Sequence, residues 1–126
     1  MNSIMAILSF KELIVWQKSM DLTKKVYQLC KKLPSEEKFG FISQMQRCAI
    51  SIPSNIAEGN KRSTAKDYVQ FLRIASGSAA ELETQLLLAC DIYKFQAEEE
   101  LALLNEIQKM LQVMSLRLLK PKTYNL

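Results

Sequence analysis

The stretch from Tyr68 to Tyr93 carries one stripe of apolar side chains whose positions alternate four and three residues apart. This spacing brings side chains onto one face of an α-helix, whereas a β-strand repeats every second residue. A long helix with one apolar face is marginal in water until another surface covers that face. The chain must therefore fold as packed helices. The stripe consists of Tyr68, Leu72, Ala75, Ala79, Leu82, Leu86, Ala89 and Tyr93.

Three further segments carry apolar stripes with the same spacing, and prolines or turn residues separate them. Pro34 and Pro121 each follow a periodic segment, where proline ends a helix because it has no backbone N–H. Four amphipathic helices with short connections predict an all-α fold, an antiparallel up-down-up-down four-helix bundle. The helices are expected at about 11–33, 36–59, 64–93 and 97–119.

The first two of these helices have features of their own. The first carries two adjacent apolar stripes, one of which includes Trp16 and Met20 and the other Val15 and Leu22. One bundle needs only one inward stripe, so the second favours an oligomer. In the second helix, Pro53 interrupts the stripe, and we expect a kink near 49–53. Gly59 is expected to cap the end of that helix.

The length of the chain, residues 1–126, suits a single domain. Residues 1–9 and 121–126 fall outside the predicted helices and are expected to be flexible tails. The apolar run before Lys11 is too short for a signal or membrane-spanning segment, so no membrane contact is expected. Three unpaired cysteines suit a reducing compartment, which predicts a cytoplasmic protein.

The residue types present argue against an enzyme. The chain has no histidine, which removes the commonest general base, the usual catalytic triads and most zinc sites. The three cysteines lie far apart without a CxxC pair, and no phosphate-binding or nucleophile motif occurs. We therefore expect no catalytic residues, no metal and no cofactor.

Two groups of cations are candidates for contact with a polyanion, in a chain of net charge +4. Lys11, Lys18, Lys25 and Lys32 recur every seven residues and would form one ridge on the first helix. That ridge is either a solvated face or a row of phosphate contacts. The second group is denser and surrounds the turn before the third helix, where arginine suits paired hydrogen bonds to phosphate. It consists of Lys61, Arg62, Lys66 and Arg73.

Polar residues also lie on or near the apolar stripe of the second helix. Antiparallel pairing around Lys61 would place Ser51 opposite about Leu72 and Arg47 near Ser76. Buried polar groups must be hydrogen-bonded, so a network that locks helix register is the simplest interpretation. Di-iron bundles also use carboxylates, but they need Glu-x-x-His motifs, which this chain lacks. The predicted network comprises Arg47, Ser51, Asn55, Glu58, Glu81 and Glu83.

Several segments resemble a known bacterial family. They are QMQRCAISIPSNIAEG at 44–59, FLRIASGS at 71–78, ELETQL at 81–86 and the opening FKELIVWQK at 10–18. Together they resemble the four-helix-bundle proteins encoded by intervening sequences of 23S ribosomal RNA genes. The resemblance spans about 10–119, and a proline inside a helical segment makes it specific.

The resemblance implies a small cytosolic bundle that assembles as a homopentamer. A related branch, the accessory variability proteins of diversity-generating retroelements, forms basic barrels that bind nucleic acid and associate with a reverse transcriptase. For this chain, a pentamer would sum to a charge of about +20 around a shared channel. The expected partners are therefore further copies of the chain, RNA or DNA, and a reverse transcriptase. The two functions left open are nucleic-acid binding and a protein-interaction scaffold.

Overall fold

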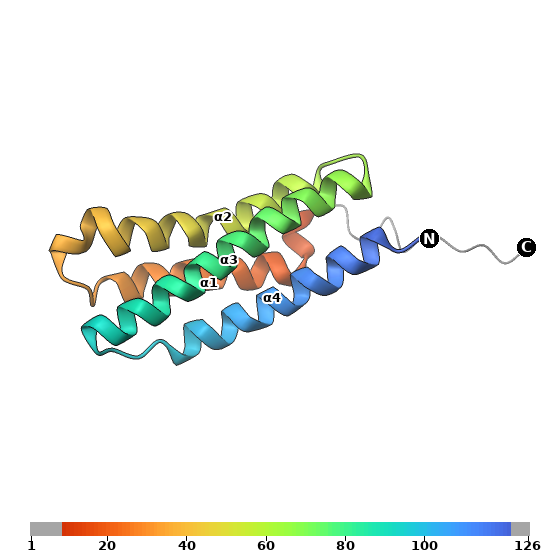
Figure 1. The fold of residues 1–126 in the computed structure, drawn as a ribbon. Coiled ribbons are helices and arrows are strands. Elements are labelled where there is room, and N and C mark those ends of the chain that lie inside the picture. Colours follow the sequence, from red (N-terminus) through yellow and green to blue (C-terminus); the bar gives the residue numbers. More distant parts are fainter. Residues whose placement is uncertain (1–8, 122–126) are drawn as a thin grey trace, which may run out of the picture.

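The structure, a computed structural model, describes residues 9–121. Within that range four long helices follow one another: α1 (Ile14–Cys30), α2 (Ser43–Asn60), α3 (Ala65–Tyr93) and α4 (Glu98–Leu119). Figure 1 shows consecutive helices running in opposite directions, and α4 returns to pack beside α1. The predicted all-α four-helix bundle is confirmed. Apart from Ser9 and Pro121, the predicted tails lie outside the described residues.

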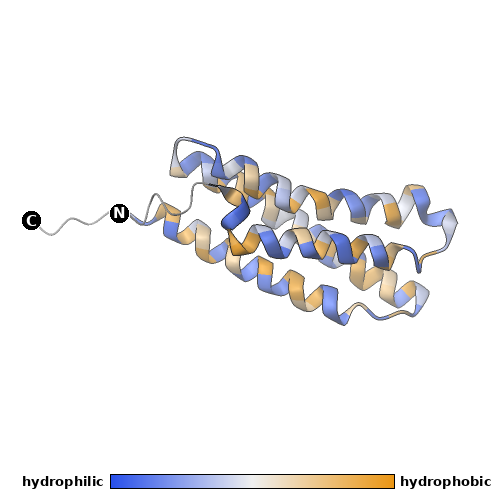
Figure 2. Cartoon of the chain, turned by 180° about the vertical axis from the view of Figure 1, so that it is seen from behind, coloured by the Kyte–Doolittle hydropathy of each residue, from blue (hydrophilic) through white to orange (hydrophobic). Residues whose placement is uncertain are grey.

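The apolar stripes face the centre of the bundle. Along α3, the six members between Leu72 and Ala89 are fully buried, and α2 and α4 contribute residues such as Ile52 and Ile107. Figure 2 shows hydrophobic residues recurring along each of the four helices. On α1, the stripe that includes Val15 and Leu22 enters the core. The stripe that includes Trp16 and Met20 is only half-buried and stays on the surface.

Two helix starts agree with the prediction, since α3 and α4 each begin within one residue of the expected position. At the start of α3, Thr64 accepts a hydrogen bond from the Asp67 N–H at 3.1 Å, whereas Ala97 before α4 makes no side-chain cap. α1 is shorter than the predicted 11–33. At its start, Phe10–Glu12 forms a separate 3-10 turn, labelled η2. At its end, the α-helix stops at Cys30, because residues 31–33 make hydrogen bonds to the carbonyl three residues earlier.

The predicted second helix, 36–59, is wrong at its start. Ser35–Glu37 is a 3-10 turn (η3) and Lys38–Ile42 a π-helical turn (η4), so α2 begins only at Ser43. Gly40 adopts φ −108° and ψ −113°, which no helix accommodates. The Glu37 carboxylate accepts a hydrogen bond from the Phe41 N–H at 3.2 Å and holds this irregular turn.

Pro53 does not interrupt α2, which continues through it to Asn60. A proline at this position leaves the carbonyl of Ala49, four residues earlier, without its helical donor. The hydroxyl oxygen of Thr23, on α1, lies 3.1 Å from that carbonyl oxygen and 2.8 Å from the carbonyl oxygen of Ser19. A neighbouring helix therefore satisfies the acceptor that Pro53 leaves open.

Gly59 does not cap α2, which also corrects the prediction. No glycine among the described residues has positive φ, and Gly59 is a buried residue inside the helix. A Cβ at this position would lie 2.8 Å from the Cβ of Phe71 and 2.9 Å from Cδ1 of Tyr68. Gly59 is thus needed for the close approach of α2 and α3 beside their turn.

Candidate nucleic-acid interface

The cations predicted around the α2–α3 turn lie at one end of the bundle, where η2 and the C-terminal end of α4 also meet (Figure 1). We call this region the basic end. Its acids are Glu12, Glu58 and Asp67, and only Glu58 forms an ion pair with a described residue. The cations of the basic end are all exposed: Lys11, Lys61, Arg62, Lys66, Arg73, Arg117 and Lys120.

Aromatic rings support two of these cations. The Arg62 guanidinium carbon lies 4.6 Å from the centroid of the Phe71 ring, and Arg62 also pairs with Glu58 at 3.1 Å. The Lys61 ammonium lies 5.9 Å from the centroid of the Phe10 ring. Such contacts hold a charged group over a ring face and leave its hydrogen-bond donors free at the edge.

Of the four lysines of the predicted ridge, only Lys11 belongs to the basic end. Lys18 pairs with Glu106 at 3.0 Å and Lys25 with Glu99 at 2.8 Å, and both acids belong to α4. The hydrogen bond between Lys25 and Glu99 raises the pKa of the lysine and lowers the pKa of the carboxylate. Lys32 follows α1 at the opposite end of the bundle, and Lys11 belongs to η2. Half of the ridge is therefore neutralised by neighbouring carboxylates.

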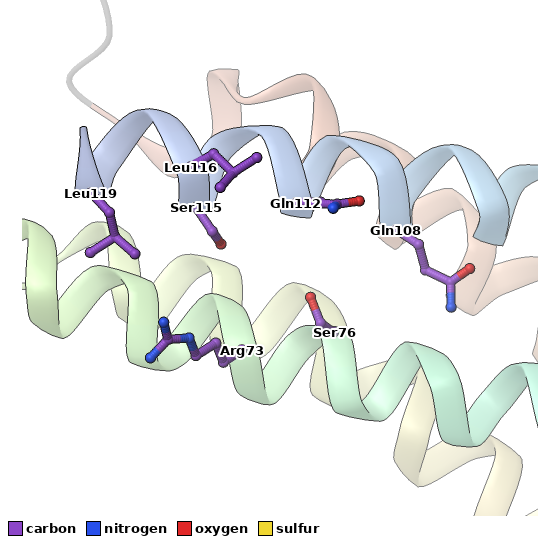
Figure 3. Close-up of a pocket in the computed structure, with 7 residues that line it drawn as sticks. All are labelled: Arg73, Ser76, Gln108, Gln112, Ser115, Leu116 and Leu119. Carbon is purple, nitrogen blue, oxygen red and sulfur yellow. The ribbon is translucent and has the colours of Figure 1, made fainter.

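Beside the basic end, α3 and α4 border a surface pocket of about 410 Å³, which we call the α3/α4 groove (Figure 3). Arg73 and Ser76 come from α3, and Gln112 and Leu116 from α4. The sequence pattern gave no signal for the α4 residues, because they flank the apolar stripe of that helix and only the packing of two helices brings them to Arg73. The lining residues are Arg73, Ser76, Gln108, Gln112, Ser115, Leu116 and Leu119.

Comparison with known proteins places the chain in a family. The profile of the 23S rRNA-intervening sequence protein family matches residues 11–115. The chain belongs to this family. It is also similar to a crystal structure from Bacteroides thetaiotaomicron, described as a protein with unknown function from the S23 ribosomal protein family. That match has a TM-score of 0.74 at 28% identity and covers 81% of this chain and 98% of the other. None of the curated proteins compared with the chain matches it.

In this family member, the polar residues of α2 meet α3 in a different register from the one predicted. Ser51 lies 2.7 Å from Ser78, hydroxyl to hydroxyl, rather than opposite Leu72. The Asn55 amide donates to the carbonyl and hydroxyl oxygens of Ser51 at 2.8 and 3.0 Å. The predicted register centred the turn on Lys61, but α2 continues to Asn60 and a four-residue turn follows before Ala65, so the opposing residues of α3 lie further along the chain.

Two further members of the predicted network lie beside this pair of serines. Arg47 and Glu81 line one small cavity of about 180 Å³ together with Ser51 and Ser78, without forming an ion pair there. Glu58 instead bonds Arg62, and Glu83 accepts a hydrogen bond from Gln108 at 3.2 Å on the α4 side. The structure therefore brings Arg47, Ser51, Asn55 and Glu81 together and places Glu58 and Glu83 elsewhere.

The cysteine thiols offer little nucleophilic character. Burial raises the pKa of the Cys30 thiol to about 11. Burial and the nearby Glu81 carboxylate also raise the pKa of Cys48, whose thiol lies 3.6 Å from that carboxylate. Within residues 9–121, no three cysteine or acidic side chains gather where a metal ion could bind. None of the helices described is both long and apolar enough to cross a membrane.

A second surface lies on the other side of the bundle, between α1 and α2. It is a pocket of about 390 Å³ bordered mainly by apolar residues, and we call it the α1/α2 groove. Beyond Ile50 it continues into a neighbouring pocket that includes Tyr27 and Phe39, and Phe39 is 87% exposed. The α1/α2 groove is lined by Trp16, Met20, Thr23, Ile50, Pro53, Ser54 and Ala57.

Proposed function

We propose that this chain is a non-enzymatic, cytoplasmic RNA-binding protein that contacts the RNA backbone through its basic end. The observation that carries the proposal is the excess of cations at the basic end. Among residues 9–121, seven exposed lysines and arginines lie there with three acids, and Lys66 and Arg73 form no ion pair, whereas Lys18 and Lys25 in the middle of the ridge are paired with acids. Free exposed cations can release the counterions of a phosphate backbone.

The choice of RNA over DNA is supported by the family to which the chain belongs, whose description refers to an intervening sequence of 23S rRNA. The cations of the basic end come from the α2–α3 turn, a 3-10 turn, the start of α3 and the end of α4, and all are exposed. Such a surface suits recognition of backbone and shape rather than of base sequence.

The test is binding of a labelled stem–loop RNA, measured by filter binding across a salt series. Each lost phosphate contact should reduce the slope of log affinity against log salt by about 0.7 to 0.9. The triple variant Arg62→Ala/Lys66→Ala/Arg73→Ala should therefore lose about two units of slope and more than tenfold in affinity at low salt.

The matched control removes the same charge from the opposite end of the bundle. Lys24, Lys31 and Lys38 are exposed lysines without an ion pair among the described residues. The variant Lys24→Ala/Lys31→Ala/Lys38→Ala should keep the wild-type slope. Equal losses in both triple variants would mean that net charge alone drives binding, and a flat salt response of the wild type would exclude backbone binding.

We further propose that the chain acts as a homo-oligomer, the pentamer that its resemblance implied, and that the α1/α2 groove supplies contact area. Support comes from the second apolar stripe of α1, which the bundle itself leaves half-exposed. Light scattering at micromolar concentration should return a multiple of 14.4 kDa. The variant Ile50→Asp should lower that mass, and a monomeric wild type would exclude the oligomer.

A second candidate function is a scaffold for a partner protein, such as an accessory subunit of a reverse transcriptase. The exposed apolar side chains Val113 and Leu116 on α4 favour it, because apolar surface outside the core marks protein contacts. A purified reverse transcriptase that binds the chain after nuclease treatment, with the triple alanine variant binding equally well, would favour the scaffold over RNA binding.

A further inference from the structure

We propose that the α3/α4 groove holds one unpaired nucleotide of a bound RNA, with a phosphate at Arg73 and the base against Leu116 and Leu119. This inference rests on the proposed function, because the groove begins where the basic end finishes. Arg73 belongs to both surfaces, since it is a cation of the basic end and a wall of the groove. The volume of about 410 Å³ falls within the range of pockets that enclose small ligands.

Arg73 is suited to the phosphate. Figure 3 shows its side chain extending from α3 toward the end of the groove marked by Leu119. Among residues 9–121 it forms no ion pair, so its five N–H donors are not committed to a carboxylate. Glu83, which borders the groove at Gln108, accepts a hydrogen bond from that amide, whereas Arg73 lies toward the opposite end of the groove. A guanidinium in this setting can bind a phosphate through two parallel hydrogen bonds.

The opposite wall suits the base. Leu116 is 64% exposed and Leu119 is 48% exposed, so both present apolar surface that the fold itself does not use. Enzymes and binding proteins that take a base out of a stack pack it against aromatic or apolar side chains. No aromatic residue in the described part of the chain lines the groove, so we expect modest affinity.

The middle of the groove offers hydrogen bonds to the edge of a base. Gln112 supplies both a donor and an acceptor, and Ser76 and Ser115 add hydroxyl groups from the two helices. None of these three side chains makes a hydrogen bond recorded within the described part of the chain. In a double helix the base edges are already paired, so the groove should select unpaired nucleotides.

The experiment compares two RNAs of equal length by fluorescence anisotropy, a single strand and a blunt-ended duplex. The variant Gln112→Ala should lower affinity for the single strand about fivefold and leave affinity for the duplex and the salt slope unchanged. The matched control is Gln28→Ala, which removes an exposed glutamine from α1 at the other end of the bundle and should change neither affinity. Irradiation of a 4-thiouridine single strand should crosslink the peptide that contains Leu116.

Other outcomes separate this inference from the proposed function. If Gln112→Ala changes neither affinity, or both equally, while the triple variant of the basic end still loses binding, the nucleotide pocket is excluded and RNA binding stands. If the wild type binds neither RNA, both proposals fall. If Leu116→Asp lowers the mass in light scattering, the groove is a contact between copies of the chain and not a nucleotide site.

Discussion

The two ends of the bundle are held together in different ways. At the basic end, α2 and α3 close on each other through backbone proximity, because Gly59 leaves room for Tyr68 and Phe71. A four-residue turn, 61–64, completes the connection. The charged side chains at this end contribute one ion pair, between Arg62 and Glu58, and both partners belong to the same stretch of chain.

At the opposite end, charged side chains hold the fold. One oxygen of the Glu37 carboxylate accepts the Phe41 N–H and the other accepts the hydroxyl of Tyr93, which joins η4 to the end of α3. Lys25 connects α1 to α4 through Glu99. The acids here are Glu36, Glu37, Asp91, Glu98, Glu99 and Glu100.

This contrast bears on function. A cation paired with a neighbouring acid is less available to a partner than an unpaired cation. At the basic end, seven exposed cations accompany three acids, whereas the six acids at the opposite end lie among lysines such as Lys24, Lys25 and Lys31. The proposed RNA contact uses the end where cations outnumber acids.

The largest effect on stability is expected from Gly59→Ala. The new Cβ would meet the Cβ of Phe71 at 2.8 Å, and that atom is rigidly attached to the α3 backbone. The helices must move apart, which should cost about 1–3 kcal/mol of unfolding free energy despite the better helix propensity of alanine. Urea unfolding followed by circular dichroism measures this loss.

Gly77→Ala is the control for that change. It also replaces a helical glycine, but no atom lies within 4 Å of the added Cβ. Alanine should therefore stabilise the protein by about 0.5–1 kcal/mol through helix propensity alone. If Gly59→Ala is as stabilising as Gly77→Ala, close approach is not what holds the basic end together.

Gly59 also illustrates the limits of the sequence. The stripes predicted α3 and α4 to within one residue of each start, because each start has a local signal: the cap Thr64 before α3 and an acidic first turn in α4. Gly59 was predicted as a cap, since a glycine near the end of a helical pattern is usually one. In the structure, Gly59 leaves room for Phe71 on α3. A pattern along the sequence cannot show that these two residues are in contact.

The same reason explains the other differences. Pro53 is tolerated because a hydroxyl on α1, that of Thr23, lies beside the buried carbonyl of Ala49 that has lost its helical donor. The lysine spacing on α1 is real, but Glu106 and Glu99, which pair with Lys18 and Lys25, lie far along the chain on α4. The cations around the α2–α3 turn could be predicted because they are close in sequence. The α3/α4 groove could not, because it exists only where two helices meet.

A smaller effect is expected from Tyr93→Phe, and it should depend on pH. The hydrogen bond to Glu37 raises the pKa of Tyr93 from 10.0 to about 12, because ionised tyrosine has no proton to donate. The hydroxyl therefore stabilises the fold fully below its ordinary pKa of 10.0, and this contribution disappears as the pH rises toward 12. Wild type should be more stable than Tyr93→Phe at neutral pH, and the difference should shrink above pH 10.0.

Ultraviolet titration of tyrosinate checks the cause directly. The variant Tyr93→Phe should remove the tyrosinate step near pH 12 that belongs to Tyr93. Cys30 does not confuse the comparison, because its raised pKa is present in both proteins. A titration curve whose step near pH 12 survives in Tyr93→Phe would show that Glu37 does not hold the hydroxyl in solution.

The smallest effects should come from single lysines, and they sharpen the contrast between the ends. Lys25→Met removes an ion pair between α1 and α4, so it should slightly lower the unfolding free energy in low salt and have no effect in high salt. Lys66→Met removes a cation without an ion pair among the described residues, so it should leave stability unchanged and weaken RNA binding. Urea unfolding measures the stability of each variant, and filter binding measures its affinity for RNA. If Lys66→Met loses as much stability as Lys25→Met, the cations of both ends serve the fold, and the reason for assigning RNA to the basic end disappears.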